Sequence, residues 1–193
     1  LTDPYDRGLR RPELVPIAAE GEGVVSGTAH ADNVAPSILG GFTIATASGV
    51  ESVSTDISLV ACLPEIAVST RDARRVVPET AQMAAVVETV GNAATLAVGM
   101  CRGDPDLVGR GMDDPLVTPA RAELITGYSA VREAAINAGA TGVTVSGAGP
   151  SVLAVCRARD QRAVGNAMLT TFDNHEVDAR VYQTQVSEGA TIL

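Results

Sequence analysis

Apolar and polar residues follow two different periods along this chain, and together the periods predict a mixed structure of helices and strands. Helical spacing covers residues 12–20, 34–39, 70–77, 79–101, 118–126, 129–138 and 160–171. Alternation or short β-branched runs predict strands over 42–46, 56–62, 64–68, 141–145, 152–156 and 177–186. From residue 56 the order is typical of an α+β fold, in which helices cover one face of an antiparallel sheet.

The longest helical pattern covers residues 79–101, and their Ala, Val and Met content predicts a buried helix. A different stretch bears on domain organisation. Residues 47–55 are small and polar and predict a turn or linker. We therefore expect one domain over residues 1–52 and a second over 53–193.

Charge narrows the possible partners. The net charge is −9, and all 14 basic residues are Arg. An acidic surface without Lys suits a halophilic source, although drift from Lys to Arg in a GC-rich genome would give the same composition. Either origin disfavours nucleic acid and acidic membrane surfaces as partners.

No apolar run approaches the roughly 18 residues of a membrane span, and no leader opens the chain, so a cytoplasmic protein is expected. Cys62, Cys101 and Cys156 lie far apart in or beside apolar segments. Their spacing predicts three buried, reduced thiols.

The first chemical constellation is His30-Ala31-Asp32-Asn33, followed by a small-residue segment and a Gly-Gly break. Asp32 or Asn33 is expected to cap a short helix over 34–39, where outward N–H groups favour an anionic ligand. A capped surface helix without a ligand is the alternative. A metal site is disfavoured because no third ligand lies near His30 and Asp32.

Two further constellations lie downstream. Thr70 and Arg74 are four residues apart on one predicted helix face, and Arg121 lies at a helix start. An Arg fork is suited to a carboxylate, although solvated arginines explain the same pattern. Residues 146–151 form a glycine-rich turn between two predicted strands, so a dinucleotide-binding motif is disfavoured. Such a turn either aims N–H groups at an anion or simply closes a hairpin.

Taken together, these segments resemble the homoserine kinase branch of the superfamily of galactokinases, homoserine kinases, mevalonate kinases and phosphomevalonate kinases (GHMP kinases). The matching strings are GEGVVSGTAHADNVAPSILGGFT at 21–43, EIAVSTRDARRVVP at 65–78, PARAEL at 119–124 and GVTVSGAGPSVLAV at 142–155. The resemblance implies transfer of the ATP γ-phosphate to the hydroxyl of L-homoserine, in threonine biosynthesis. It also implies the end of the GHMP kinase N-terminal domain, followed by the C-terminal α+β domain, with a homodimer as one option.

The resemblance also assigns roles to residues. His30 and Asn33 are implied to contact homoserine, and Asp32 to orient its hydroxyl or to accept its proton. The α-carboxylate is implied to lie at Arg74 and Arg121, with Thr70 beside them. The residues implied to support the phosphate end are Gly147, Ala148 and Gly149.

One departure concerns ATP. The family's Gly-rich phosphate loop, which also supplies a hydroxyl to Mg2+, precedes the HADN segment, and no such loop is found in residues 1–20. We therefore expect this chain to be the C-terminal two-thirds of a longer enzyme that uses ATP and Mg2+, and to be inactive alone. The alternatives are a non-catalytic amino-acid-binding or interaction module, and a GHMP kinase with a different alcohol substrate.

Overall fold

The computed structural model describes residues 8–26 and 31–191, and the chain divides into two compact units. The first unit comprises Leu1–Asp56 with Val186–Leu193, and the second comprises Ile57–Gln185. The expected boundary after residue 52 would fall inside a strand, Gly49–Val53, and the last residues group with the first unit rather than the second. That these units are parts of kinase N- and C-terminal domains remains a prediction.

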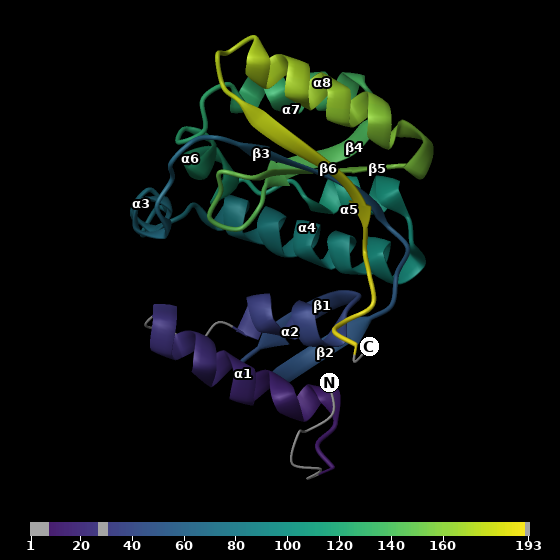
Figure 1. The fold of residues 1–193 in the computed structure, drawn as a ribbon. Helices are drawn as coiled ribbons and strands as arrows, with labels where there is room; N and C mark the ends of the chain where they lie inside the picture. Colours follow the sequence, from purple (N-terminus) through teal and green to yellow (C-terminus); the bar gives the residue numbers. More distant parts are fainter. Residues whose placement is uncertain (1–7, 27–30, 192–193) are drawn as a thin grey trace. The chain divides into compact units, whose positions relative to one another are not determined.

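The first unit contains two helices and a two-stranded antiparallel ribbon (Figure 1). Its elements are α1 (Arg11–Ser26), α2 (Ala31–Leu39), β1 (Phe42–Thr46) and β2 (Gly49–Val53). A small core of Val15, Ala35 and Ile38 joins α1 to α2. The predicted strand at 42–46 is confirmed.

Strand β2 corrects the expected linker over 47–55. A two-residue turn follows Thr46, whose hydroxyl donates to the Gly49 carbonyl at 3.1 Å. This turn brings Gly49–Val53 back along β1, where backbone pairing does not require apolar side chains. The small and polar residues of this segment show no strand pattern, so the sequence analysis missed the strand.

The second unit is built on a four-stranded antiparallel sheet in the order β4-β5-β3-β6. Its strands are β3 (Ser58–Pro64), β4 (Ala140–Val145), β5 (Val152–Cys156) and β6 (Ala179–Gln185). Its helices are α3 (Thr70–Arg75), α4 (Met83–Arg102), α5 (Pro105–Gly111), α6 (Thr118–Ala122), α7 (Tyr128–Asn137) and α8 (Gln161–Asp173), with a 3-10 turn, η1 (Ala158–Asp160). The predicted α+β class is confirmed, whereas the predicted strand over 64–68 is wrong because β3 ends at Pro64.

Helices cover both faces of this sheet rather than one. Helices α7 and α8 lie on one face, over the main core, and α4 and α5 lie on the other (Figure 1). Helix α5 approaches β4 closely because two glycines face each other. A Cβ on Gly109 would lie 2.1 Å from the Thr141 oxygen, and one on Gly142 would lie 2.5 Å from the Gly109 Cα.

Helix α4 is mostly exposed, which corrects the expectation that it is buried. Among its described residues only Gly99 is buried, whereas Val87 and Val90 are 65% and 64% exposed. By length and composition alone, α4 is also the one described helix long and apolar enough to cross a membrane, contrary to the sequence expectation. In this unit it packs along α5.

The three cysteines differ in their exposure to solvent. Cys62 in β3 and Cys156 in β5 are buried, as expected. Cys101 lies on α4 and is exposed, so the expectation of three buried thiols is wrong for this residue.

Candidate functional site

Helix α3 places two of the predicted site residues on one side of the second unit. Ser69 caps the helix, because its Oγ accepts a 3.0 Å hydrogen bond from the Asp72 amide. Thr70 and Arg74 follow one helical turn apart, and both are exposed. The predicted helix start and the shared face are therefore confirmed.

Arg121 links α3 to the glycine-rich turn. It lies on α6, and its Nε donates to the Ala73 carbonyl in α3 at 3.3 Å. Its Nη1 donates to the Gly147 carbonyl at 2.8 Å. A guanidinium carries about five N–H donors, so about three remain for a ligand. The structure thus brings together three segments that lie far apart in the sequence.

Asp114 holds α6 in place, and the sequence analysis missed it. Its two carboxylate oxygens accept hydrogen bonds from the amides of Leu116, Val117 and Thr118, at 2.9–3.2 Å. Burial alone would raise the pKa of this carboxyl, but those amides and the Thr118 hydroxyl hold it below its ordinary value. The Asp-Pro pair before a Thr-Pro helix start was the available signal.

The turn over 146–151 closes the β4–β5 hairpin. The Ser146 amide donates to the Ser151 carbonyl at 2.8 Å, and the Gly149 amide donates to the Ser146 carbonyl at 2.9 Å. Gly147 and Gly149 have φ of +55° and +84°, which favours glycine. Strand, turn and strand follow one another, so the predicted strand–turn–strand unit is confirmed.

Two backbone N–H groups of this turn face no partner in the described part of the chain. They belong to Gly147 and Ala148, neither of which donates to any described residue. Gly147 is exposed, and a Cβ added there would meet nothing within 4 Å. Consecutive free N–H groups in a turn are suited to an anion such as a phosphate.

The remaining predicted residues belong to the first unit. Asp32 and Asn33 are exposed in the first turn of α2, which begins at Ala31 rather than at 34. Neither residue is therefore the predicted N-cap. The Asn33 carbonyl accepts a 3.0 Å hydrogen bond from the Ser37 hydroxyl. His30 lies outside the described residues.

The site residues thus form two groups, one in each unit. Thr70, Arg74, Arg121 and the glycine turn belong to the second unit, and Asp32 and Asn33 to the first. The described residues contain no cluster of three or more His, Cys, Asp or Glu side chains able to hold a metal ion. The residues in the second unit provide positively charged guanidinium groups and backbone N–H donors, which suit carboxylate and phosphate oxygens.

Comparison with known proteins adds independent information. Residues 96–174 match the family described as GHMP kinases C terminal. A homoserine kinase from Halorubrum lacusprofundi is 69% identical over 98% of this chain and 64% of its own length. A homoserine kinase from Natronomonas pharaonis is 67% identical over 100% of this chain and 66% of its own length. The chain therefore spans slightly less than two thirds of these relatives.

A solved structure agrees with the sequence comparisons. The crystal structure of homoserine kinase from Cytophaga hutchinsonii matches with a TM-score of 0.87 at 34% identity. The match covers 95% of this chain and 60% of that protein. The similarity extends across both units and is not confined to residues 96–174.

Proposed function

We propose that this chain is the substrate-binding part of a homoserine kinase of the GHMP kinase superfamily, since residues 96–174 match the family described as GHMP kinases C terminal and homoserine kinases 67–69% identical match 98–100% of the chain. The reaction joins the side-chain oxygen of L-homoserine to the γ-phosphorus of ATP. The bond from that phosphorus to the bridging oxygen between the β- and γ-phosphates breaks, ADP leaves, and the hydroxyl proton is released to solvent. The product, O-phospho-L-homoserine, is an intermediate of threonine biosynthesis.

The observation that carries this proposal is the position of Arg121 between α3 and the glycine turn. A kinase for a small amino acid must hold its carboxylate and keep its hydroxyl near the transferred phosphate. Arg121 contacts Gly147 in the turn and Ala73 in the helix that carries Arg74. One side chain therefore fixes a carboxylate site relative to a phosphate site.

Each residue has a proposed task. Arg74 and Arg121 hold the α-carboxylate, and Thr70 donates or accepts a hydrogen bond beside them. Asn33 and His30 contact the substrate, and Asp32 orients the hydroxyl. The N–H groups of Gly147 and Ala148, with Gly149 shaping the turn, support the phosphate end.

ATP and Mg2+ are proposed as co-substrate and metal of the whole enzyme. The free N–H groups of the turn fit a phosphate, whereas the described residues hold no metal-binding cluster. No step here is therefore assigned to the metal. A cytoplasmic location accords with this biosynthetic role, and the acidic, Lys-free composition accords with a salt-rich interior.

An assay of ADP release by the full-length protein tests the proposal. L-Homoserine and mevalonate are offered separately with ATP, and faster turnover of homoserine is expected. Faster turnover of mevalonate would favour another GHMP kinase. Calorimetry on the 193-residue chain with homoserine, threonine and ATP adds a second test: homoserine binding without ATP binding is expected, and binding of threonine alone would favour a non-catalytic sensor module.

A further inference from the structure

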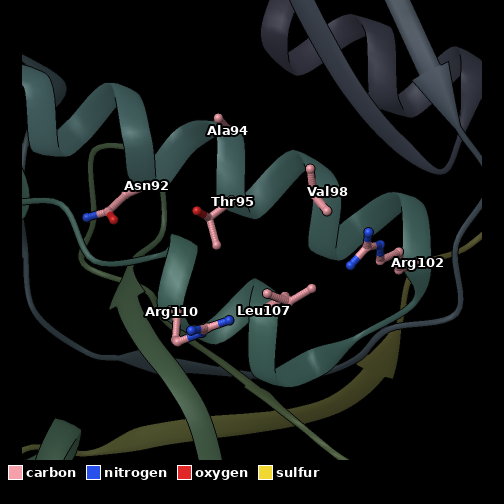
Figure 2. Close-up of a pocket in the computed structure, with 7 residues that line it drawn as sticks. All are labelled: Asn92, Ala94, Thr95, Val98, Arg102, Leu107 and Arg110. Atoms are coloured by element: carbon pink, nitrogen blue, oxygen red, sulfur yellow. The ribbon is translucent and has the colours of Figure 1, made fainter.

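Helices α4 and α5 border an open cavity of about 430 Å3 that no predicted site residue lines. The helices touch closely at two glycines: a Cβ on Gly99 would lie 2.6 Å from the Val108 amide, and one on Gly111 would lie 2.3 Å from the Leu96 amide. Larger side chains diverge around these contacts and leave the cavity open. Its lining residues are Asn92, Ala94, Thr95, Val98, Arg102, Leu107 and Arg110 (Figure 2).

Two arginines give the lining of this cavity a positive charge. Figure 2 shows the guanidinium groups of Arg102 and Arg110 extending toward Leu107 from opposite sides. Within the described ranges, 8–26 and 31–191, neither makes an ion pair or a hydrogen bond. Both side chains are exposed at the edge of the cavity, so their guanidinium groups are accessible to an anion from solution.

Two carboxylates near the arginines in the sequence have other partners. Asp104 caps α5, accepting hydrogen bonds from the amides of Asp106 and Leu107 at 3.0 and 3.2 Å. Asp106 forms an ion pair with Arg157 at 2.6 Å. These two acids therefore do not neutralise the arginines of the cavity.

The rest of the lining is apolar or already hydrogen-bonded. Val98 and Leu107 present aliphatic surface beside the arginines. The Thr95 hydroxyl donates to the Gly91 carbonyl at 2.9 Å, and the Asn92 amide donates to the Asp113 carbonyl at 2.8 Å. Two cationic groups with aliphatic surface beside them match a molecule with a charged head and an apolar body.

We propose that this cavity binds a small organic anion. Its carboxylate or phosphate lies between Arg102 and Arg110, because a guanidinium fork donates two parallel hydrogen bonds to either group. Its apolar part contacts Val98 and Leu107. The volume falls in the range of about 300–1,000 Å3 typical of small-molecule sites. This site does not depend on the kinase assignment, since the cavity contains none of the residues proposed for homoserine or phosphate.

Methyl NMR spectra of the full-length protein, labelled at Val and Leu methyl groups, test the proposal. Hexanoate and inorganic phosphate are titrated separately at constant potassium chloride concentration. Hexanoate is expected to shift the Val98 and Leu107 signals in a saturable way, and phosphate to compete with it. R102Q and R110Q are each expected to weaken hexanoate binding about tenfold.

The matched control is R162Q, which removes an exposed arginine on α8, on the other face of the sheet, and is expected to leave binding unchanged. Unchanged circular dichroism spectra establish that each variant is folded. The proposal is overturned if hexanoate gives no saturable shift, if R162Q weakens binding as much as R102Q, or if hexanol, which lacks the charge, binds equally well.

Discussion

Arg121 donates a 2.8 Å hydrogen bond from its Nη1 to the Gly147 carbonyl, so a proposed carboxylate ligand also supports the proposed phosphate turn. Arg74 lies exposed on α3. The two arginines were predicted to share one task. The structure indicates that Arg121 has a second one, because it also links α3 to the turn.

Replacing Arg74 by Ala in the full-length protein is expected to weaken homoserine binding by about 2–5 kcal/mol if the carboxylate is desolvated. ATP affinity should barely change. Arg121→Ala is expected to weaken homoserine similarly and to destabilise the second unit by about 1–3 kcal/mol, because the Ala73 and Gly147 carbonyls lose their donor. Calorimetry and denaturant unfolding measure both effects.

Arg75→Ala is the matched control, since Arg75 is an exposed neighbour on α3 whose ion pair with Asp72 spans 3.8 Å. It should leave homoserine affinity unchanged. If Arg74→Ala weakens ATP and homoserine equally, the substitution has disrupted the site as a whole, and Arg74 loses its assignment.

Asp114 predicts a pH-dependent contribution to stability. Its pKa is lowered in the folded state, so the folded protein binds this proton more weakly than the unfolded chain does. The contribution is therefore complete above the ordinary Asp pKa of about 3.9 and is lost as the pH falls through the lower folded value. Asp114→Asn should cost about 1 kcal/mol at neutral pH, in line with a helix cap, and less in acid.

Denaturant unfolding at neutral pH and near pH 3 measures that difference. Asp178→Asn is the control, because the described structure shows only its backbone carbonyl in a hydrogen bond, to the Glu65 amide. A loss for Asp114→Asn that stays constant with pH would contradict the assigned role.

Features that depend on residues close together in the sequence could be predicted, whereas features that depend on distant residues could not. The strand at 42–46 and the Ser69 cap were predictable, because alternation and capping are local signals. The exposure of α4 was not. The apolar residues of a helix show how much surface the helix could bury. Whether other elements cover that surface depends on the whole fold.

The candidate site shows the same division. Thr70 and Arg74 share a face at a local spacing, which the sequence revealed. The contacts of Arg121 reach residues 48 and 26 positions away, and no periodicity encodes them. The glycine turn was left open between an anion site and a plain hairpin. The structure shows the hairpin, and the free N–H groups of Gly147 and Ala148 keep the anion site as a proposal.

Tyr128 carries a buried hydroxyl with no hydrogen-bond partner in the described part of the chain. Burial raises its pKa, so the group remains a neutral phenol at all moderate pH values. Tyr128→Phe keeps the ring and removes an unpaired polar atom. The free energy of unfolding is expected to stay the same or to rise by up to about 1 kcal/mol.

Tyr182→Phe, at a side chain that is 52% exposed, is the control and should change stability by less than about 0.5 kcal/mol. A clear loss of stability in Tyr128→Phe alone would show that this hydroxyl has a partner after all.

The three thiols should differ in reactivity. Burial raises the pKa of Cys62 to about 11, and burial with the Asp160 carboxylate raises that of Cys156 to about 11. Both are therefore protonated at pH 8 and shielded, whereas Cys101 is exposed. A thiol titration with Ellman's reagent should find one fast-reacting group in the folded chain and three after unfolding. Cys101→Ser should abolish the fast reaction; fast labelling that persists in this variant would contradict the burial of the other two.

The last prediction concerns whether Asp32 accepts the homoserine proton or only positions the hydroxyl. Asp32 lies exposed in the first turn of α2, where its carboxylate can accept a hydrogen bond from a substrate hydroxyl. A loose phosphoryl transfer lets the hydroxyl proton leave late, so the reaction needs an oriented hydroxyl more than a strong base. We therefore expect Asp32→Asn in the full-length enzyme to lower turnover by about ten- to a hundredfold, as loss of one orienting hydrogen bond would. Steady-state kinetics with calorimetric homoserine affinities separate the two roles, since a loss of about ten-thousandfold with unchanged affinity would establish Asp32 as a general base.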